Sequence, residues 1–392
     1  MERGYFLDAT ADRHFSLLKI DDALKDLIYE ITSGAVRWRG YFDWILSSLE
    51  IGRVKRETLL LLYLAMYQLF FLDKAAHHVV KETVEYVKRV QGREAAGFVN
   101  AVLRRIMREG REIPLPAEPV TRLSVKYSFP IWIVRRWHER FGAERTEKIL
   151  ANLSRRPRFC LRVDTSRMER EHAMEELKKA GLQVTAGRYV DTALYVEKLR
   201  PVLKHELLKK GVISVQDEAS QRAVCLLGGK EGERILDACC GLGTKGRQIK
   251  ELFGVEPVSM DIRRRERKIQ RFVLGDCLSP PLKEEAFDRI LLDAPCSSLG
   301  IIRRHPEIKW RRKEEHVAQF LSYQFDLLKG LIGTLRRGGR IVYSVCSFEE
   351  EETEHVIRRA QSELGLKVEE AFLSVPDEYE MDGFFAARLE KP

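Results

Sequence analysis

The stretch ILDACCGLGTKG, residues 235–246, decides the fold of the C-terminal half of this chain. An apolar run typical of a buried strand ends here in Asp237, and three glycines follow with the spacing GxGxxG. Glycines at such a turn let backbone N–H groups approach a ligand, and Asp261, at the end of the next expected strand, is placed to hold ribose hydroxyls. The pattern predicts a nucleotide-type cofactor at the start of an α/β domain.

Two cofactors fit this loop. The spacing alone also suits NAD, so a dinucleotide-binding oxidoreductase is one interpretation. The carboxylate of Asp237 favours the other, because it would repel a pyrophosphate but attract the cationic methionyl part of S-adenosylmethionine (SAM). A further acidic residue, Asp276 in VLGDC (273–277), could reach the adenine amino group, although a strand-end aspartate also commonly caps a turn.

Strands and helices alternate on both sides of the glycine loop. We expect strands at residues 233–238, 256–261, 271–275, 288–293 and 340–345, with a final pair near 367–373 and 383–389. Such alternation predicts a mostly parallel, Rossmann-like sheet covered by helices.

The first part of the chain has a different pattern. From Asp21 to about Arg111 the apolar residues recur at helical spacing, and the last predicted helix carries a basic flank of Arg104, Arg105 and Arg108. The proline-rich stretch at 111–119 reads as a linker. A further helical stretch to Ser154 and a small α+β segment from Arg158 lead into the α/β domain.

Composition limits the class of protein. The 392 residues carry a net charge of +9, partly clustered at 263–268, Arg303–Arg304 and 311–313, which suits a polyanionic partner such as RNA. The longest apolar run, 59–72, is shorter than the roughly 18 residues of a membrane span, and no signal-peptide pattern is present, so we expect a cytoplasmic protein without membrane contact. Seven cysteines without a CxxC pair predict neither a disulfide framework nor a metal site.

Two cysteines follow apolar runs: Cys296 in LLDAPCSSLG (291–300) and Cys346 in IVYSVCSFEEEE (341–352). Carbon 5 of cytosine becomes nucleophilic when a thiolate adds to carbon 6 with a hydrogen bond at N3, and the ring must later release that thiolate. Asp293 and two thiols match these needs. Ser347 and Glu350 form a capping-box pattern, which predicts that Cys346 precedes a helix whose N-terminus favours thiolate. Buried cysteines that only fill space are the alternative.

The chain resembles the bacterial 16S rRNA cytosine-5 methyltransferases of the Sun (Fmu, RsmB) type, within the RNA cytosine-5 methyltransferase superfamily. The resemblance rests on AAHHVVKETVEYVKR (75–89) and FVNAVLRR (98–105), similar to the NusB-type RNA-binding module, and on RPRFCLRVDTSR (156–167). It rests further on VQDEASQ (215–221), LDAPCSSLGIIRRHPEIKW (292–310), YSVCS (343–347) and DGFFAARLEK (382–391).

The resemblance implies an all-α NusB-like domain over residues 1–120, a small α+β RNA-binding domain over 121–212 and a Rossmann-like SAM-dependent catalytic domain over 213–392. It implies that Cys346 is the nucleophile and that Cys296 assists product release. DNA cytosine-5 methyltransferases differ, because they attack with the thiol of a Pro-Cys pair, and in this chain that thiol would be Cys296. The residues that it assigns to SAM or the target base are Cys239, Cys240, Gly241, Leu242, Gly243, Thr244, Lys245, Asp261, Asp276 and Asp293.

The expected activity is methylation of cytosine carbon 5 in RNA, with 16S rRNA or a small-subunit precursor as partner and the protein as a monomer. The sequence departs from the family in its glycine loop, in Val345 before the nucleophile, and in the short segment between Asp261 and Asp276. A tRNA methyltransferase and an RNA-binding assembly factor with weakened catalysis therefore stand as alternatives, beside the oxidoreductase.

Overall fold

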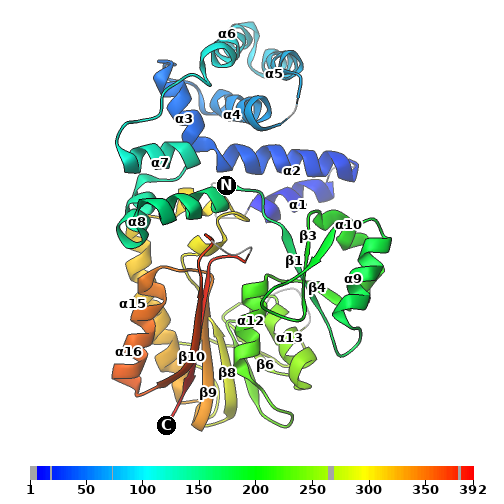
Figure 1. The fold of residues 1–392 in the computed structure, drawn as a ribbon, viewed down its shortest axis with the longest axis vertical. Helices are drawn as coiled ribbons and strands as arrows, with labels where there is room; N and C mark the ends of the chain where they lie inside the picture. The colour runs from blue at the N-terminus through cyan, green and yellow to red at the C-terminus, as the bar shows by residue number, and fades with distance from the viewer. Residues whose placement is uncertain (1–6, 18–19, 73, 264–268, 378–380) are drawn as a thin grey trace. The chain divides into compact units, whose positions relative to one another are not determined.

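The computed structural model describes residues 7–17, 20–72, 74–263, 269–377 and 381–392. The chain forms two compact units, one of Met1–Arg155 with Ile302–Arg311 and the other of Arg156–Ile301 with Arg312–Pro392 (Figure 1). We call them unit 1 and unit 2. Within the described ranges no helix is long and apolar enough to cross a membrane. Most of the basic cluster predicted at 263–268 lies outside the described residues.

Unit 1 is helical throughout its described part, as the sequence predicts. Its helices are α1 (Leu7–Leu17), α2 (Asp22–Arg37), α3 (Arg39–Ser48), α4 (Arg56–Phe71), α5 (Ala76–Gln91), α6 (Arg93–Glu109), α7 (Pro119–Tyr127), α8 (Ile131–Ser154) and the short α14 (Ile308–Arg311). The apolar stripes of α5 and α6 are buried against α4, with Val87, Val99 and Leu103 fully covered. Helix α2 approaches α4 closely because Gly34 lies on the ring of Tyr67, where a Cβ would come within 2.0 Å of the ring carbon Cζ.

Residues 302–311 join unit 1 although they lie far along the chain. Lys309 is fully buried, its Nζ donates to the carbonyl of Arg37 over 2.9 Å, and it lies 4.0 Å from the ring centroid of Phe129. The indole of Trp310 donates to the carbonyl of Val36 over 2.7 Å. The segment is thus fastened to the C-terminal end of α2, which the sequence does not predict.

Unit 2 contains two sheets. The smaller has the order β2-β3-β1-β4, with every neighbour antiparallel. Its strands are β1 (Phe159–Val163), β2 (Val184–Ala186), β3 (Ala193–Val196) and β4 (Ile213–Val215), accompanied by α9 (Arg170–Lys179), α10 (Leu199–Lys204) and α11 (Glu206–Lys209). This is the small α+β region expected from Arg158 onward.

The larger sheet has the order β10-β11-β9-β8-β5-β6-β7. Its strands are β5 (Ile235–Ala238), β6 (Val258–Asp261), β7 (Phe272–Leu274), β8 (Phe287–Asp293), β9 (Leu335–Val345), β10 (Lys367–Ser374) and β11 (Phe384–Glu390). Strands β5 to β9 pair in parallel, whereas β11 pairs antiparallel with both β9 and β10. All seven predicted strands are present, and the mostly parallel sheet is confirmed.

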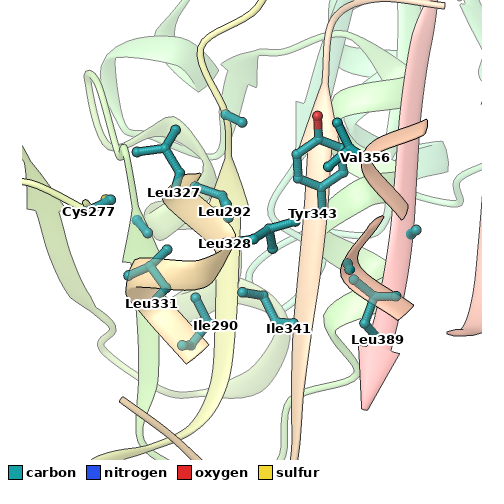
Figure 2. Packing of buried hydrophobic residues seen from close by; sticks show 14 of the residues in the cluster. Cys277, Ile290, Leu292, Leu327, Leu328, Leu331, Ile341, Tyr343, Val356 and Leu389 are labelled. Atoms are coloured by element: carbon teal, nitrogen blue, oxygen red, sulfur yellow. The ribbon is translucent and has the colours of Figure 1, made fainter. Parts of the chain in front are cut away.

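Helices cover both faces of this sheet (Figure 1). They are α12 (Glu218–Leu227), α13 (Thr244–Phe253), α15 (Glu314–Ile332) and α16 (Glu354–Leu364), with short 3-10 turns η1 (Leu299–Ile301) and η2 (Glu350–Glu352). Alternate strand residues face opposite layers: Ile290 and Leu292 pack with α15 and α16, whereas Leu291 packs with α12 and α13. Figure 2 shows the first layer, where Leu327, Leu328 and Leu331 of α15 lie against the sheet.

Candidate active site

The carboxyl ends of the parallel strands gather the predicted site residues at one edge of the sheet. Strand β5 leads into the glycine loop, β6 ends in Asp261, β8 ends in Asp293, and Cys346 directly follows β9. In open α/β sheets the crevice outside these strand ends is where ligands bind. The structure therefore brings together residues from four separate sequence motifs.

The glycine loop is anchored to the neighbouring strand. The backbone N–H of Gly241 donates to Asp261 Oδ2 over 2.9 Å, and Gly241 and Gly243 have φ angles of 56° and 73°, in the left-handed region. Gly246 has no room for a side chain, because a Cβ there would come within 2.8 Å of Asp237 Oδ2. The loop thus places backbone groups beside two carboxylates.

Asp293 is held at the centre of the site. Lys245 Nζ donates to Asp293 Oδ2 over 2.5 Å, and the Ser344 hydroxyl donates to Asp293 Oδ1 over 3.0 Å. Burial alone would lower the pKa of Lys245, but the Asp293 carboxylate outweighs it and raises that pKa above its usual value. Lys245 therefore carries its proton at neutral pH.

The two thiols are in contact: Cys296 Sγ lies 3.2 Å from Cys346 Sγ, and the Ser298 hydroxyl oxygen lies 3.5 Å from Cys346 Sγ. The hydrogen bond to Cys346, together with burial, raises the pKa of Cys296 well above its usual value. The same bond lowers the pKa of Cys346, and the Ser298 contact adds to this effect. These directions favour ionisation of Cys346 over ionisation of Cys296.

A cavity of about 270 Å³ opens beside this pair. Its lining residues are Gln216, Asp217, Ser220, Lys245, Asp293, Ala294, Ile301, Cys346, Asp382 and Phe384. Pockets for drug-sized ligands span about 300–1,000 Å³, so this one suits a smaller group. Cys346 lines the cavity, whereas Cys296 is buried next to it and does not.

Comparison with known proteins decides the family. The model described as 16S rRNA methyltransferase RsmB/F matches residues 224–390, the NusB family model matches 1–108, and a ferredoxin-like domain model of RsmF/B-like methyltransferases matches 129–203. Ribosomal RNA small subunit methyltransferase B of Escherichia coli O6:K15:H31 is 31% identical over 95% of this chain and 92% of its own length. The chain belongs to the RsmB/F family of 16S rRNA methyltransferases.

Other relatives of this RsmB/F-family chain agree. A probable ribosomal RNA small subunit methyltransferase B of Bacillus subtilis is 30% identical over 86% of this chain and 80% of its own length. A methyltransferase homologue from Pyrococcus horikoshii has the same fold, with a TM-score of 0.61 at 23% identity, over 71% of this chain and all of that one. The domain models bear out the predicted NusB-like, α+β and Rossmann-like architecture, while the predicted boundaries at 120 and 212 stay predictions.

The family identifies SAM, not NAD, as the cofactor. The residues present fit it. Asp237 is fully buried, and neither of its carboxylate oxygens has a hydrogen-bond partner of normal geometry among the described residues. Burial raises the pKa of Asp237 to about 7, although the Lys245 ammonium opposes this rise. An unsatisfied buried carboxylate at the loop suits the cationic methionyl group, and Asp261 next to it suits the ribose.

Two local predictions are wrong. The capping box of Ser347 and Glu350 does not form: the Ser347 oxygen accepts the backbone N–H of Glu349 over 3.2 Å, its hydroxyl donates to Glu352 Oε2 over 2.6 Å, and Glu349 is the N-cap of η2. Only the three-residue η2 follows, and α16 begins at Glu354, so no helix N-terminus adjoins Cys346. Contact with Cys296 and Ser298, and not a helix dipole, lowers the pKa of its thiol.

The structure also moves Asp276 away from a strand end. Strand β7 ends at Leu274, and Asp276 Oδ1 accepts the backbone N–H of Leu278 over 2.9 Å, as a turn-capping aspartate does. The adenine contact proposed for Asp276 stays a prediction. Apolar side chains are exposed to solvent on this side of the site. Among them are Leu242 in the glycine loop and Ile262, which directly follows β6.

Several cavity residues were not assigned a role from the sequence. Gln216, Asp217 and Ser220 come from the start of α12, and Asp382 and Phe384 come from the start of β11. Both stretches stood out only as parts of the resemblance, VQDEASQ and DGFFAARLEK. No motif in the sequence marks these residues as part of a site, because only the fold brings them to the cavity that Cys346 lines.

Proposed function

We propose that this protein methylates carbon 5 of a cytosine in 16S rRNA, with Cys346 as nucleophile, Asp293 at the base and Cys296 in product release. The relatives named ribosomal RNA small subunit methyltransferase B support the RNA substrate. The observation that carries the chemistry is the asymmetric thiol pair, in which Cys346 lines the cavity and Cys296 lies in contact with it outside the cavity lining.

The first step is addition of the Cys346 thiolate to carbon 6 of the base, which forms a carbon–sulfur bond and turns carbon 5 into an enamine-type nucleophile. A proton or hydrogen bond at N3 draws electrons from the ring during this attack. We assign this contact to Asp293 with Lys245: the Lys245 ammonium supplies a proton to the Asp293 carboxylate, and the resulting carboxyl group donates it to N3. Bound SAM supplies the electrophilic methyl group that carbon 5 takes up.

The last step removes the carbon 5 proton, restores the ring double bond and expels the Cys346 thiolate. Once Cys346 is bonded to carbon, it no longer carries the charge that raises the pKa of Cys296. Cys296 then releases its own proton to solvent more easily, and the thiolate so formed takes up the proton from carbon 5, which restores the Cys296 thiol. The contact that keeps Cys296 protonated before attack is thus removed by the attack itself.

Two cysteine variants test these roles in a reaction with small-subunit rRNA and labelled SAM. Cys346→Ala should abolish methyl transfer and any covalent RNA complex. Cys296→Ala should still attack but fail to release, leaving an RNA adduct that survives a denaturing gel. Cys225→Ala is the control, because that thiol is exposed and lies outside the cavity. An adduct with Cys346→Ala and none with Cys296→Ala would make Cys296 the nucleophile.

The substrate needs its own experiment. Bisulfite mapping of rRNA and tRNA from a strain that lacks the gene should show the loss of one modified cytosine in 16S rRNA. Loss from a tRNA would reassign the substrate while keeping the chemistry, and unchanged maps of both would point to an assembly factor without methyl transfer.

A further inference from the structure

The two cysteine loops share one buried anion. Glu352 of η2 is fully covered, and its carboxylate accepts hydrogen bonds from both loops. From the Cys296 loop it accepts the Ser297 backbone N–H on Oε1 over 2.6 Å and the Ser297 hydroxyl on Oε2 over 2.5 Å. From the Cys346 loop it accepts the Ser347 hydroxyl on Oε2 over 2.6 Å. Each bonded serine directly follows a reactive cysteine.

A fourth donor completes the carboxylate. Gln324 of α15 donates from Nε2 to Glu352 Oε1 over 3.1 Å, and the same nitrogen lies 2.9 Å from the carbonyl of Pro295, the residue before Cys296. The Tyr343 hydroxyl, labelled in Figure 2, lies 2.8 Å from Gln324 Oε1. A carboxylate has about four acceptor positions, and here each oxygen accepts two bonds. The network is saturated, which fixes its geometry.

We propose that Glu352 is a positioning residue that sets the distance between the two catalytic cysteines by tying Ser297 and Ser347 to one carboxylate. This inference rests on the proposed function and extends it. The reaction needs Cys296 close enough to hydrogen-bond Cys346 before attack and to reach carbon 5 afterward. Neither cysteine touches Glu352 directly, so Glu352 acts through the backbone of the two loops.

The charge of Glu352 reinforces this role. Its carboxylate is one of the charges that raise the pKa of Cys296, after the bond to Cys346 and burial. It therefore helps to keep the proton on Cys296 while Cys346 ionises.

Three variants test the proposal with RNA that carries 5-fluorocytosine, whose fluorine cannot leave as a proton does and so traps the adduct. Glu352→Gln should lower kcat on ordinary cytosine RNA, and the rate of adduct formation on the fluorinated RNA, about 100-fold, the cost of a misplacement of ~1 Å at reacting atoms. Ser347→Ala should slow attack more than release, and Ser297→Ala, assayed on ordinary cytosine RNA, should slow release more than attack. The Kd for SAM should be unchanged in all three, since Glu352 does not reach the glycine loop.

Glu363→Gln is the control, because that glutamate lies on the surface of α16 and pairs with Arg359 there. Native kcat and adduct formation in Glu352→Gln, beside an active wild type, would overturn the positioning role alone. If Glu352→Gln does not fold, Ser347→Ala decides, and a native rate of attack in that variant overturns the proposal. Loss of SAM binding together with kcat would show a general structural role and overturn it too. A wild type that forms no adduct would refute the proposed function itself.

Discussion

The contact between the small sheet and the cofactor loop gives a prediction with a defined magnitude. Arg162 of β1 has a side chain only 1% exposed and forms a two-pronged ion pair with Glu251 of α13, from Nε to Oε2 over 2.8 Å and from Nη2 to Oε1 over 3.1 Å. Its Nη1 also lies 3.2 Å from the carbonyl of Thr244, which belongs to the glycine loop and begins α13, and it contacts Gln216 of the cavity.

Arg162→Met should lower the free energy of unfolding of unit 2 by about 3–5 kcal/mol, because it leaves the largely buried carboxylate of Glu251 without its partner. The matched control is Lys179→Met, which breaks the exposed pair with Glu176, where the lysine side chain is 70% exposed. An exposed pair contributes about 0.2–1 kcal/mol, so this variant should be nearly native. SAM binding should weaken only in Arg162→Met, since only that variant loosens the end of the glycine loop.

Urea unfolding of the two variants, of Glu251→Gln and of the double variant Arg162→Met/Glu251→Gln measures this directly. The two single changes should not add, and the coupling energy should exceed about 1 kcal/mol. Strict additivity within about 0.5 kcal/mol, or a cost for Arg162→Met no larger than that for Lys179→Met, would refute the reasoning.

Three other changes have expected outcomes. Asp261→Ala should weaken SAM binding in a calorimetric titration by roughly 1–3 kcal/mol through a lost polar contact, and unchanged affinity would place the ribose elsewhere. Neutralising Arg104 and Arg108 should flatten the salt dependence of RNA binding, whereas Arg105 also donates to the carbonyl of Leu49 and its loss should lower stability as well. Burial, then the charge of Arg37, holds the pKa of Lys309 well below its usual range. Between the lowered pKa of the folded protein and about pH 10.4, Lys309 is more protonated in the unfolded chain than in the folded one. The free energy of unfolding should therefore rise with pH in this window, and Lys309→Met should remove that part of the slope. Equal slopes in the two proteins would contradict it.

The sequence by itself determined the architecture and the residues to which the chemistry is assigned, but only three of the ten residues that line the cavity: Lys245, Asp293 and Cys346. Helical and strand periodicity predicted the helical unit and all seven strands of the large sheet, because burial of one face imposes that spacing locally. The glycine loop, Asp261, Asp293 and the two cysteines were found because each stands where an apolar strand ends. Parallel strands bring such ends to one edge, so a linear pattern was enough to predict that these residues meet.

Only the tertiary structure decided how the thiols differ. The local pattern at Ser347 and Glu350 predicted a helix cap, but Ser347 instead donates to Glu352, a bond that also depends on Ser297 from a loop fifty residues earlier. The burial of Lys309 against Arg37 and Phe129 likewise joins parts of the chain that no periodicity connects. Hydrogen bonds and burial between distant segments depend on three-dimensional distance, and the pKa of a thiol follows from those neighbours, so neither could be derived from spacing along the chain.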